Sequence, residues 1–241
     1  MIDWHNHVLP EMDDGSRSVA ESIAMLQAQA AQGVTTVMAT PHFYANDESV
    51  ASFLQRRSRS ADLLREQRQD DTLPSVRLGA EVRYYRGISR MQGLSDLCIE
   101  GSNLLLLEMP MSRWTESMIR ELIGMSGKDG ICLLLAHMDR YLSFQSREVW
   151  GRLLDNGILM QTNASFFTAF TTRRKALSLL SEGYIHLLGS DCHNMTSRPP
   201  QIGKAFDVIQ KRFGADYLSQ MNEYGYSLLD THSNSSQERK I

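Results

Sequence analysis

The stretch SVAESIAMLQAQAAQGVTTVMATPHF, residues 18–43, contains one helix followed by one strand. Ser18 and Glu21 have the spacing of a capping box, and apolar residues then recur at helical intervals. These features predict a helix over residues 18–32. The β-branched and apolar run that follows predicts a buried strand over residues 34–39.

The same alternation continues along the chain. Helix-like stretches lie at 18–32, 48–69, 114–127, 144–156, 168–182 and 200–213. Seven short, strand-like runs separate them, at 1–4, 34–39, 76–80, 104–107, 131–135, 158–161 and 185–188. Alternating strands and helices, with strands that are apolar throughout, predict a parallel sheet that is covered on both faces.

Seven such units in 241 residues predict an α/β fold with seven parallel strands in a closed or nearly closed barrel. A doubly wound open sheet is the alternative. No glycine-rich dinucleotide turn follows the first strand, which disfavours the Rossmann version of that sheet. We expect one domain over residues 1–230 and a polar tail over residues 231–241.

Composition excludes several classes of function. The net charge of -3 gives no sign of binding to nucleic acid or to an anionic membrane surface. The three cysteines are widely spaced, which argues against a disulfide framework and for a reducing compartment. The sequence has neither the pattern of a signal peptide nor an apolar run that could span a bilayer. We therefore expect a cytoplasmic protein without direct membrane insertion.

Side chains that bind metal ions follow six of the seven predicted strands. Ligands of parallel α/β folds bind at the carboxyl ends of the strands, so these side chains are expected to share one rim. The candidate ligands are His5, His7, Asp14, His42, Glu81, Glu108, His137, Asp191 and His193. Any one of them alone is more often a solvated or hydrogen-bonded residue.

As a set, these nine groups point to metal ions. So many carboxylates and imidazoles at one rim would repel each other without positive charge among them, and metal ions supply that charge. Histidine and carboxylate ligands without a thiolate suit manganese, iron, cobalt or zinc. Nine ligands exceed what one ion takes, so we expect two or three ions. Such a site supports phosphoryl displacement.

Two arginines follow candidate ligands closely. Arg140 lies three residues after His137, and Arg198 lies five residues after His193. A single loop arginine is usually a surface residue. Two of them beside two ligand segments predict a clamp that binds phosphate oxygens in bidentate fashion.

Residues 189–200, GSDCHNMTSRPP, also fit a different enzyme. Cys192 and Arg198 have the C-x5-R spacing of a cysteine-dependent phosphatase. That mechanism needs an acidic thiol in a loop of free backbone N–H groups. This loop contains no glycine, and two prolines follow where N–H donors would be needed. If the strand before this loop runs to His193, its alternation puts Asp191 and His193 on one side, and we expect Cys192 to point the other way, into the barrel wall or the surrounding helices.

The motifs DWHNH, DDG, TPH, GAE, AHMDR and SDCHN…RPP together resemble the polymerase and histidinol phosphatase (PHP) superfamily. More narrowly, they resemble the manganese-dependent protein-tyrosine phosphatases of capsule and exopolysaccharide operons in Gram-positive bacteria. The resemblance runs in order from residue 1 to about residue 213. It implies a distorted, seven-stranded PHP-type (β/α)7 barrel.

The resemblance also implies three ions and assigns their ligands. One ion would be held by His5, His7, Glu81 and Asp191, a second by Glu81, Glu108 and His137, and the third by Asp14, His42 and His193. Arg140 and Arg198 match the phosphate-binding arginines of the family. The expected nucleophile is a metal-activated hydroxide, with no phosphorylated enzyme intermediate.

The implied substrate is phosphotyrosine on a partner bacterial tyrosine autokinase that controls polysaccharide synthesis. A small-molecule phosphomonoester such as histidinol phosphate, a nuclease-like phosphoesterase activity and a metal-stabilised scaffold without catalysis are the alternatives. The chain has Asp139 where family members often have glutamate, and its loop over residues 43–50 is individual. Both departures bear on substrate choice.

Overall fold

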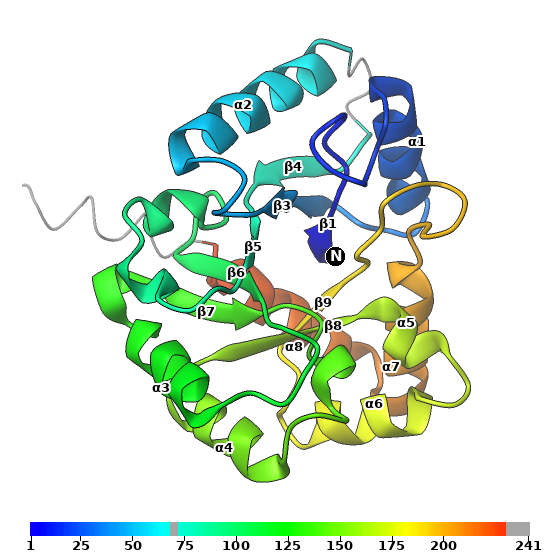
Figure 1. Cartoon of the computed structure of the whole chain (residues 1–241). Helices are drawn as coiled ribbons and strands as arrows, with labels where there is room; N and C mark the ends of the chain where they lie inside the picture. The colour runs from blue at the N-terminus through cyan, green and yellow to red at the C-terminus, as the bar shows by residue number, and fades with distance from the viewer. Residues whose placement is uncertain (68–71, 230–241) are drawn as a thin grey trace, which may run out of the picture.

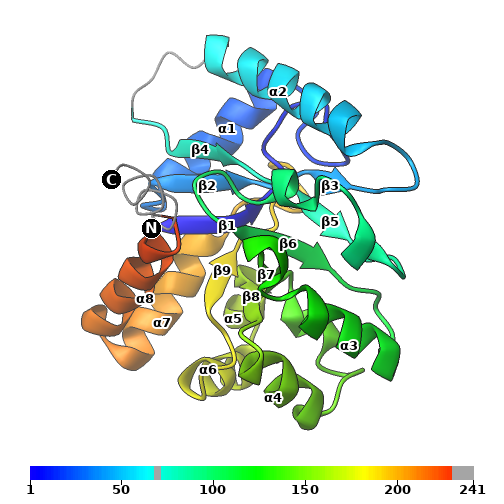
Figure 2. The ribbon, with the colours of Figure 1, turned by 90° about the vertical axis from the view of Figure 1, so that its left-hand side faces the viewer.

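Short parallel strands lie at the centre of the molecule, and helices surround them (Figure 1, Figure 2). The computed structural model describes residues 1–67 and 72–229. Its strands are β1 (Ile2–Asn6), β2 (Thr36–Ala39), β3 (His42–Phe43), β4 (Ser75–Leu78), β5 (Glu81–Arg83), β6 (Leu104–Glu108), β7 (Cys132–Leu135), β8 (Leu159–Asn163) and β9 (Leu187–Gly189).

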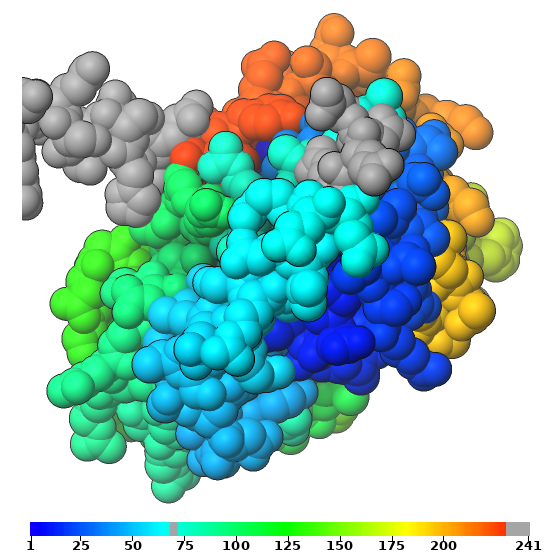
Figure 3. All heavy atoms as spheres, turned by 90° about the horizontal axis from the view of Figure 1, so that it is seen from above, coloured from blue at the N-terminus to red at the C-terminus, as the bar shows by residue number. Residues whose placement is uncertain are grey.

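Its α-helices are α1 (Val19–Ala30), α2 (Val50–Gln67), α3 (Glu116–Met125), α4 (Arg147–Asp155), α5 (Ala164–Thr168), α6 (Arg173–Ser181), α7 (Ile202–Phe213) and α8 (Ala215–Ser227). Four short 3-10 segments are η1 (Ile88–Arg90), η2 (Leu94–Leu97), η3 (Lys128–Gly130) and η4 (Met138–Tyr141). Seen from above, α2 lies across the face of the molecule beside the blue N-terminal residues (Figure 3).

The strands pair in parallel throughout, which confirms the predicted α/β class. They form a three-stranded sheet, β1-β2-β4, and a six-stranded sheet, β3-β5-β6-β7-β8-β9. The prediction of seven strands in one ring therefore differs from the nine segments seen in the described residues. The two additional segments, β3 and β5, follow breaks after β2 and β4. Pro41 lies in the first break, where its missing N–H group interrupts the ladder.

The sheet curls so that its first strand meets its last. The backbone N–H of Asp191 donates to the carbonyl of His5 over 2.8 Å, and the N–H of His7 donates to the carbonyl of Cys192 over 3.0 Å. An isolated parallel bridge joins Asn6 to Cys192. These contacts bring the first strand and the segment that follows the last strand to the same place.

The buried carboxylate of Asp3 stabilises this junction through hydrogen bonds. Asp3 is fully buried, and it accepts hydrogen bonds from Ser190, Asn6 and Gln29 at 2.6–3.0 Å. Burial raises the pKa of Asp3, and the hydrogen bonds oppose that shift. Because its donors come from β1, α1 and the segment after β9, Asp3 ties three elements together.

Each predicted helix has a counterpart in the structure. One predicted helix is divided into two helices, and one helix of the structure was not predicted. The Ser18 hydroxyl caps α1 by accepting from the N–H of Glu21, as the capping box predicts. The predicted helix over 168–182 is wrong in its first part, because α5 ends at Thr168 and α6 begins at Arg173. The Arg173 side chain donates to the carbonyls of Phe167 and Thr168, which satisfies the free end of α5. Helix α8 was not predicted.

No helix in the described ranges is both long and apolar enough to cross a membrane. All three cysteines are free, as their spacing predicted. The predicted tail over 231–241 lies outside the described residues, as does the end of the predicted helix over 48–69. The division into a domain over 1–230 and a tail therefore stays a prediction.

Candidate metal centre

The nine candidate ligands lie together where the strands end, as the sequence predicted. His5 belongs to β1, His42 to β3, Glu81 to β5 and Glu108 to β6. The others lie in the segments that directly follow strands. His5 and His7 face the same way, with 3.2 Å between their Nε2 atoms.

Glu81 occupies the middle of the cluster. Its side chain is almost fully buried, and its Oε2 atom lies 3.1 Å from His5 Nε2, 3.3 Å from His7 Nε2 and 2.9 Å from His42 Nδ1. Its other oxygen, Oε1, lies 2.9 Å from His137 Nε2. One carboxylate thus contacts four imidazole rings.

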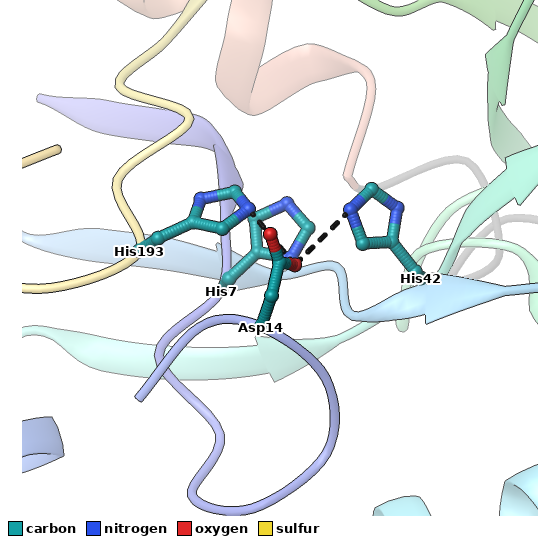
Figure 4. Close-up of side chains that lie close together, drawn as sticks. All are labelled: His7, Asp14, His42 and His193. Carbon is teal, nitrogen blue, oxygen red and sulfur yellow. Dashed lines mark ion pairs between the residues drawn. The ribbon is translucent and has the colours of Figure 1, made fainter. Parts of the chain in front are cut away.

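A second group forms at the solvent side. Asp14 Oδ1 lies 3.5 Å from His42 Nε2 and 3.4 Å from His193 Nε2, with His7 beside them (Figure 4). Asp14 reaches this group from the loop after β1 and is 67% exposed. The ligand atoms of these four residues lie within 4.8 Å of one another. Because Asp14 is exposed, a ligand can reach the group from solvent.

Glu108 lies at the edge of the cluster. Its Oε1 atom is 3.6 Å from His137 Nε2. It also forms a group with His42 and Glu81 whose ligand atoms lie within 4.8 Å of one another. Glu81 is therefore shared between neighbouring groups of potential ligands.

Asp191 joins the cluster to both arginines. Its Oδ1 atom lies 3.5 Å from His7 Nε2 and 2.8 Å from Arg198 Nη2. Its Oδ2 atom accepts from Arg140 and, over 2.9 Å, from Asn163 Nδ2. The two arginines thus meet at one carboxylate on the rim.

Two ligand positions carry unusual backbone geometry. His137 has φ of 34° and Asp191 has φ of 51°, both in the left-handed region. Residues with a Cβ rarely adopt this region, and those that do concentrate at functional sites. The strand β9 ends at Gly189, so Asp191 reaches the cluster through this turn rather than through strand alternation.

The arrangement of the ligand atoms suits bound metal ions better than hydrogen bonding among the side chains. Glu81 Oε2, His42 Nδ1 and His193 Nε2 are buried and have no hydrogen-bond partner in the described residues, although other ligand atoms lie close to them. Ligand atoms about 2.1 Å from one ion lie about 3.0–3.4 Å apart, and the separations here are similar. These atoms therefore have lone pairs that are free to bind a cation.

The titration properties point the same way. Burial disfavours the charged form of His5, but the carboxylates of Glu81 and Asp191 outweigh it and raise the pKa of His5. Burial likewise opposes the charge on Glu81, but the surrounding histidines hold the pKa of its carboxyl well below the usual range. Burial and the neighbouring His7 lower the pKa of His193 to about 4. The carboxylate of Glu81 therefore stays ionised and has positive charge beside it.

Two residues that orient ligands, Asp13 and Gln161, were not predicted from the sequence. Asp13 Oδ2 lies 2.7 Å from His7 Nδ1 and accepts from the backbone N–H of His42 over 2.9 Å. Gln161 Oε1 lies 3.4 Å from His5 Nδ1 and accepts from the N–H of His137 over 2.6 Å. Asp13 lies in the quoted DDG motif, but spacing does not tell which of its two aspartates faces the ligands.

Cys192 is no candidate nucleophile in this arrangement. Its side chain is fully buried in the apolar core, as predicted. Burial raises the pKa of the thiol far above its ordinary value. The cysteine-dependent reading therefore lacks an accessible thiolate.

Two cavities adjoin the cluster. One, of about 180 Å³, is lined by Arg140, Arg198 and Ser165 among others. The other, of about 340 Å³, is lined by Asp14, His42 and Tyr44. The first cavity thus brings two arginines to the cluster, and the second combines Tyr44 with several acidic side chains.

This fold and cluster define a parallel α/β protein with a histidine–carboxylate centre suited to several divalent ions. A sequence model of the family described as "Capsular polysaccharide synthesis, CpsB/CapC" matches residues 1–224. The chain belongs to this family.

Characterised relatives cover nearly the whole chain. The tyrosine-protein phosphatase CpsB of Streptococcus pneumoniae is 30% identical over 89% of this chain and 92% of its own length. The tyrosine-protein phosphatase YwqE of Bacillus subtilis is 29% identical over 95% of this chain and 91% of its own.

Solved structures agree. One from work on YwqE of Bacillus subtilis and CpsB of Streptococcus pneumoniae, described as unique metal-dependent tyrosine phosphatases, superposes with a TM-score of 0.80. It is 26% identical and covers 95% of this chain and 94% of its own. A histidinol phosphate phosphatase from Lactococcus lactis has a TM-score of 0.57 at 16% identity, over 88% of this chain and 93% of its own, and shows a shared fold only.

Proposed function

We propose that the protein is a manganese-dependent protein-tyrosine phosphatase. The observation that carries this proposal is the meeting of Arg140 and Arg198 at Asp191, on the rim of the nine-residue cluster. This places two phosphate-binding groups beside potential ligands of several ions. Kinship with CpsB and YwqE supports tyrosine phosphate over other phosphomonoesters.

The nine clustered residues would hold two or three ions, divided as the resemblance implies. When bound, the ions supply charge to stabilise the phosphoryl group and make water a nucleophile at neutral pH. Asp13 and Gln161 orient the imidazoles. The partners of Asp191 keep its carboxylate turned toward the cluster. Iron, cobalt or zinc would suit the same donors.

The arginines would bind the substrate's phosphate oxygens. Each now has a carboxylate partner in Asp191, so a phosphate arriving at the rim offers alternative acceptors. Tyr44 stacks on His42 with 5.4 Å between ring centroids and lines the neighbouring cavity. This aromatic face suits the ring of a phosphotyrosine.

The biological substrate would be a phosphotyrosyl protein, and we propose a cytoplasmic bacterial tyrosine kinase that regulates capsule or exopolysaccharide synthesis. We also propose that β2 with β3, and β4 with β5, are two interrupted strands of a seven-stranded barrel. Hydrogen bonds from Gly79 to Ala39 and from Glu81 to Pro41 support continuity across both breaks.

Substrate comparison tests the function. Protein stripped with a chelator is reloaded with manganese, iron, cobalt or zinc, and turnover is measured on a phosphotyrosyl peptide, histidinol phosphate and a phosphodiester. We expect no activity without metal, recovery with manganese, and a clear preference for the peptide. A higher kcat/KM for histidinol phosphate or the diester would overturn the substrate assignment.

Two variants distinguish the metal-dependent mechanism from the cysteine-dependent one. Arg198→Ala should lower kcat/KM by roughly a hundredfold, because a charged contact to the transferring phosphoryl group is lost. Cys192→Ser should retain activity and metal content. Loss of turnover in Cys192→Ser with metal content intact would favour the cysteine-dependent mechanism, and equally low activity in every variant would favour a scaffold.

A further inference from the structure

A groove lies apart from the metal centre, between α6 and the end of α7. Its volume is about 790 Å³, within the range of about 300–1,000 Å³ typical of binding sites. The side chains that matter for its chemistry are Phe170, Leu177, Phe213, Arg173, Arg174 and Arg212. No acidic residue lines it.

Phe170 gives the groove an exposed aromatic edge. Its side chain is 92% exposed, more than any other large apolar residue in the described part of the chain. The two preceding phenylalanines, Phe166 and Phe167, are buried in the core. The loop between α5 and α6 thus presents an aromatic ring to solvent, which is typical of a contact surface.

The charge of the groove is positive and lacks internal neutralisation. Residues 164–181 include two arginines and a lysine and contain no aspartate or glutamate. Among the ion pairs of the described residues, none involves Arg173, Arg174 or Arg212, whereas Arg147 and Arg152 on α4 each pair with a glutamate. In a protein of net charge -3, such a patch calls for an anionic partner.

We propose that this groove binds an acidic segment of the phosphotyrosyl protein substrate, with an aromatic or apolar side chain against Phe170 and Phe213. The inference rests on the proposed function and adds a second contact for the same substrate. The arginines provide charge complementarity, and the two phenylalanines provide apolar contact.

The groove connects with the catalytic rim through one short element. Helix α5 follows β8 directly, and its residue Ser165 lines the cavity that contains Arg140 and Arg198. Phe170 comes two residues after the end of this helix. Figure 1 shows α5 between the centre of the molecule and the loop that leads to α6. A bound polypeptide can therefore reach from the rim to the groove.

A concave surface favours a polypeptide over a membrane. An anionic bilayer would also attract arginines and an exposed phenylalanine. However, Leu177 and Phe213 line the hollow of the groove, and side chains of a peptide can enter a hollow that a bilayer surface cannot.

The test compares a long acidic substrate with a small one. The substrates are a random copolymer of glutamate and tyrosine, phosphorylated on tyrosine, and free phosphotyrosine. The variants are Phe170→Ser and the double variant Arg174→Glu/Arg212→Glu. Arg173 is left intact because it caps α5. The control is Arg59→Glu/Arg65→Glu on α2, which makes the same change of charge elsewhere.

We expect both groove variants to lower kcat/KM for the copolymer by roughly tenfold, chiefly through KM, while turnover of free phosphotyrosine stays unchanged. Binding of the unphosphorylated copolymer, followed by fluorescence anisotropy, should weaken in parallel, and the control should behave as wild type. This binding assay tests the groove even if the protein hydrolyses neither phosphotyrosine nor the copolymer, a result that would instead overturn the proposed function.

Unchanged copolymer binding and turnover in both groove variants would overturn the proposal. An equal loss on both substrates would do so too, because it would indicate damage to the catalytic centre. Cosedimentation with phosphatidylglycerol vesicles that depends on Phe170, with unchanged copolymer kinetics, would replace the peptide by a membrane.

Discussion

Asp13 decides which nitrogen of His7 is free to bind an ion. Its carboxylate lies 2.7 Å from Nδ1 and would hold a proton on that nitrogen, so that Nε2, which faces the cluster, is the atom that can exchange its proton for an ion. Asp13→Asn would remove the negative charge beside Nδ1, and in either orientation its amide N–H would face a backbone N–H that now donates to Asp13, that of His42 or that of Gly15. We expect metal affinity to fall by roughly 10–100-fold, with kcat largely restored at saturating metal.

Calorimetric titration of the stripped protein with manganese would measure this. Asp62→Asn, an exposed site on α2, removes the same charge elsewhere and should leave affinity unchanged. Wild-type affinity in Asp13→Asn would contradict the assigned role of Asp13.

His186 should make stability depend on pH independently of the metal centre. Burial lowers its pKa to about 4, and its Nδ1 accepts from the N–H of Met160. Because the folded-state pKa lies below the unfolded value of 6.5, the unfolded state binds the proton first as the pH falls. Stability should therefore drop between pH 6.5 and about 4.

From about pH 7.5 to about pH 5 this residue should cost about 2 kcal/mol of unfolding free energy. His186→Asn keeps an acceptor for Met160 and removes the titration, so its stability should fall less over that interval. Urea unfolding at both pH values would measure the difference. Parallel losses in the two proteins would show that His186 does not titrate as expected.

At this scale the sequence predicted which side chains lie together, and it missed the residues that orient them. The nine clustered residues were found because each follows a strand and all are good ligands. Asp13 and Gln161 were missed because their role depends on which imidazole nitrogen they face, and that is a matter of three-dimensional distance.

The junction of β1 and β9 depends on a residue without a side chain. A Cβ on Gly189 would lie 2.4 Å from the Cβ of His5 and 2.9 Å from its backbone nitrogen. Gly189→Ala should therefore push the two segments apart, lower stability by about 1–3 kcal/mol and weaken metal binding.

Gly151→Ala is the matched control. Gly151 lies within α4, and a methyl group added there would meet no heavy atom within 4 Å, so alanine should add about 0.5–1 kcal/mol of stability. Thermal unfolding and metal titration of both variants would decide. If stability and metal binding are unchanged in Gly189→Ala, the junction of β1 and β9 can accommodate the added methyl group without cost.

Elements were predictable where local pattern and tertiary context agree. Helix α1 has its cap and its apolar face in one stretch of sequence. The division between α5 and α6 was missed because it depends on the side chain of Arg173 reaching back to the carbonyls of Phe167 and Thr168. The breaks after β2 and β4 were missed because strand-like residues continue on both sides of them.

For the whole molecule, metal should act as a structural partner as well as a catalytic one. The buried carboxylates and imidazoles of the cluster lose mutual repulsion when cations lie between them. At metal concentrations about a hundredfold above Kd, binding should add about 2.7 kcal/mol and raise Tm by about 5–10 °C.

Differential scanning calorimetry with and without a chelator would measure this shift. Glu81→Gln should show a smaller rise in Tm on addition of manganese than wild type, because it removes the carboxylate that lies among four of the histidines. If neither the chelator nor added manganese changes Tm, the cluster does not hold ions.

The junction of the first strand with the last also sets an order on biosynthesis. The hydrogen bond between Asp3 and Ser190 spans 187 residues of sequence, and neighbouring contacts bring Asp191 to His5 and His193 to His7. On the ribosome, the first histidines emerge long before their partners exist. The growing chain therefore cannot assemble a complete centre until the last strand of the parallel sheet has been translated, and a chain that stops before Asp191 lacks part of it.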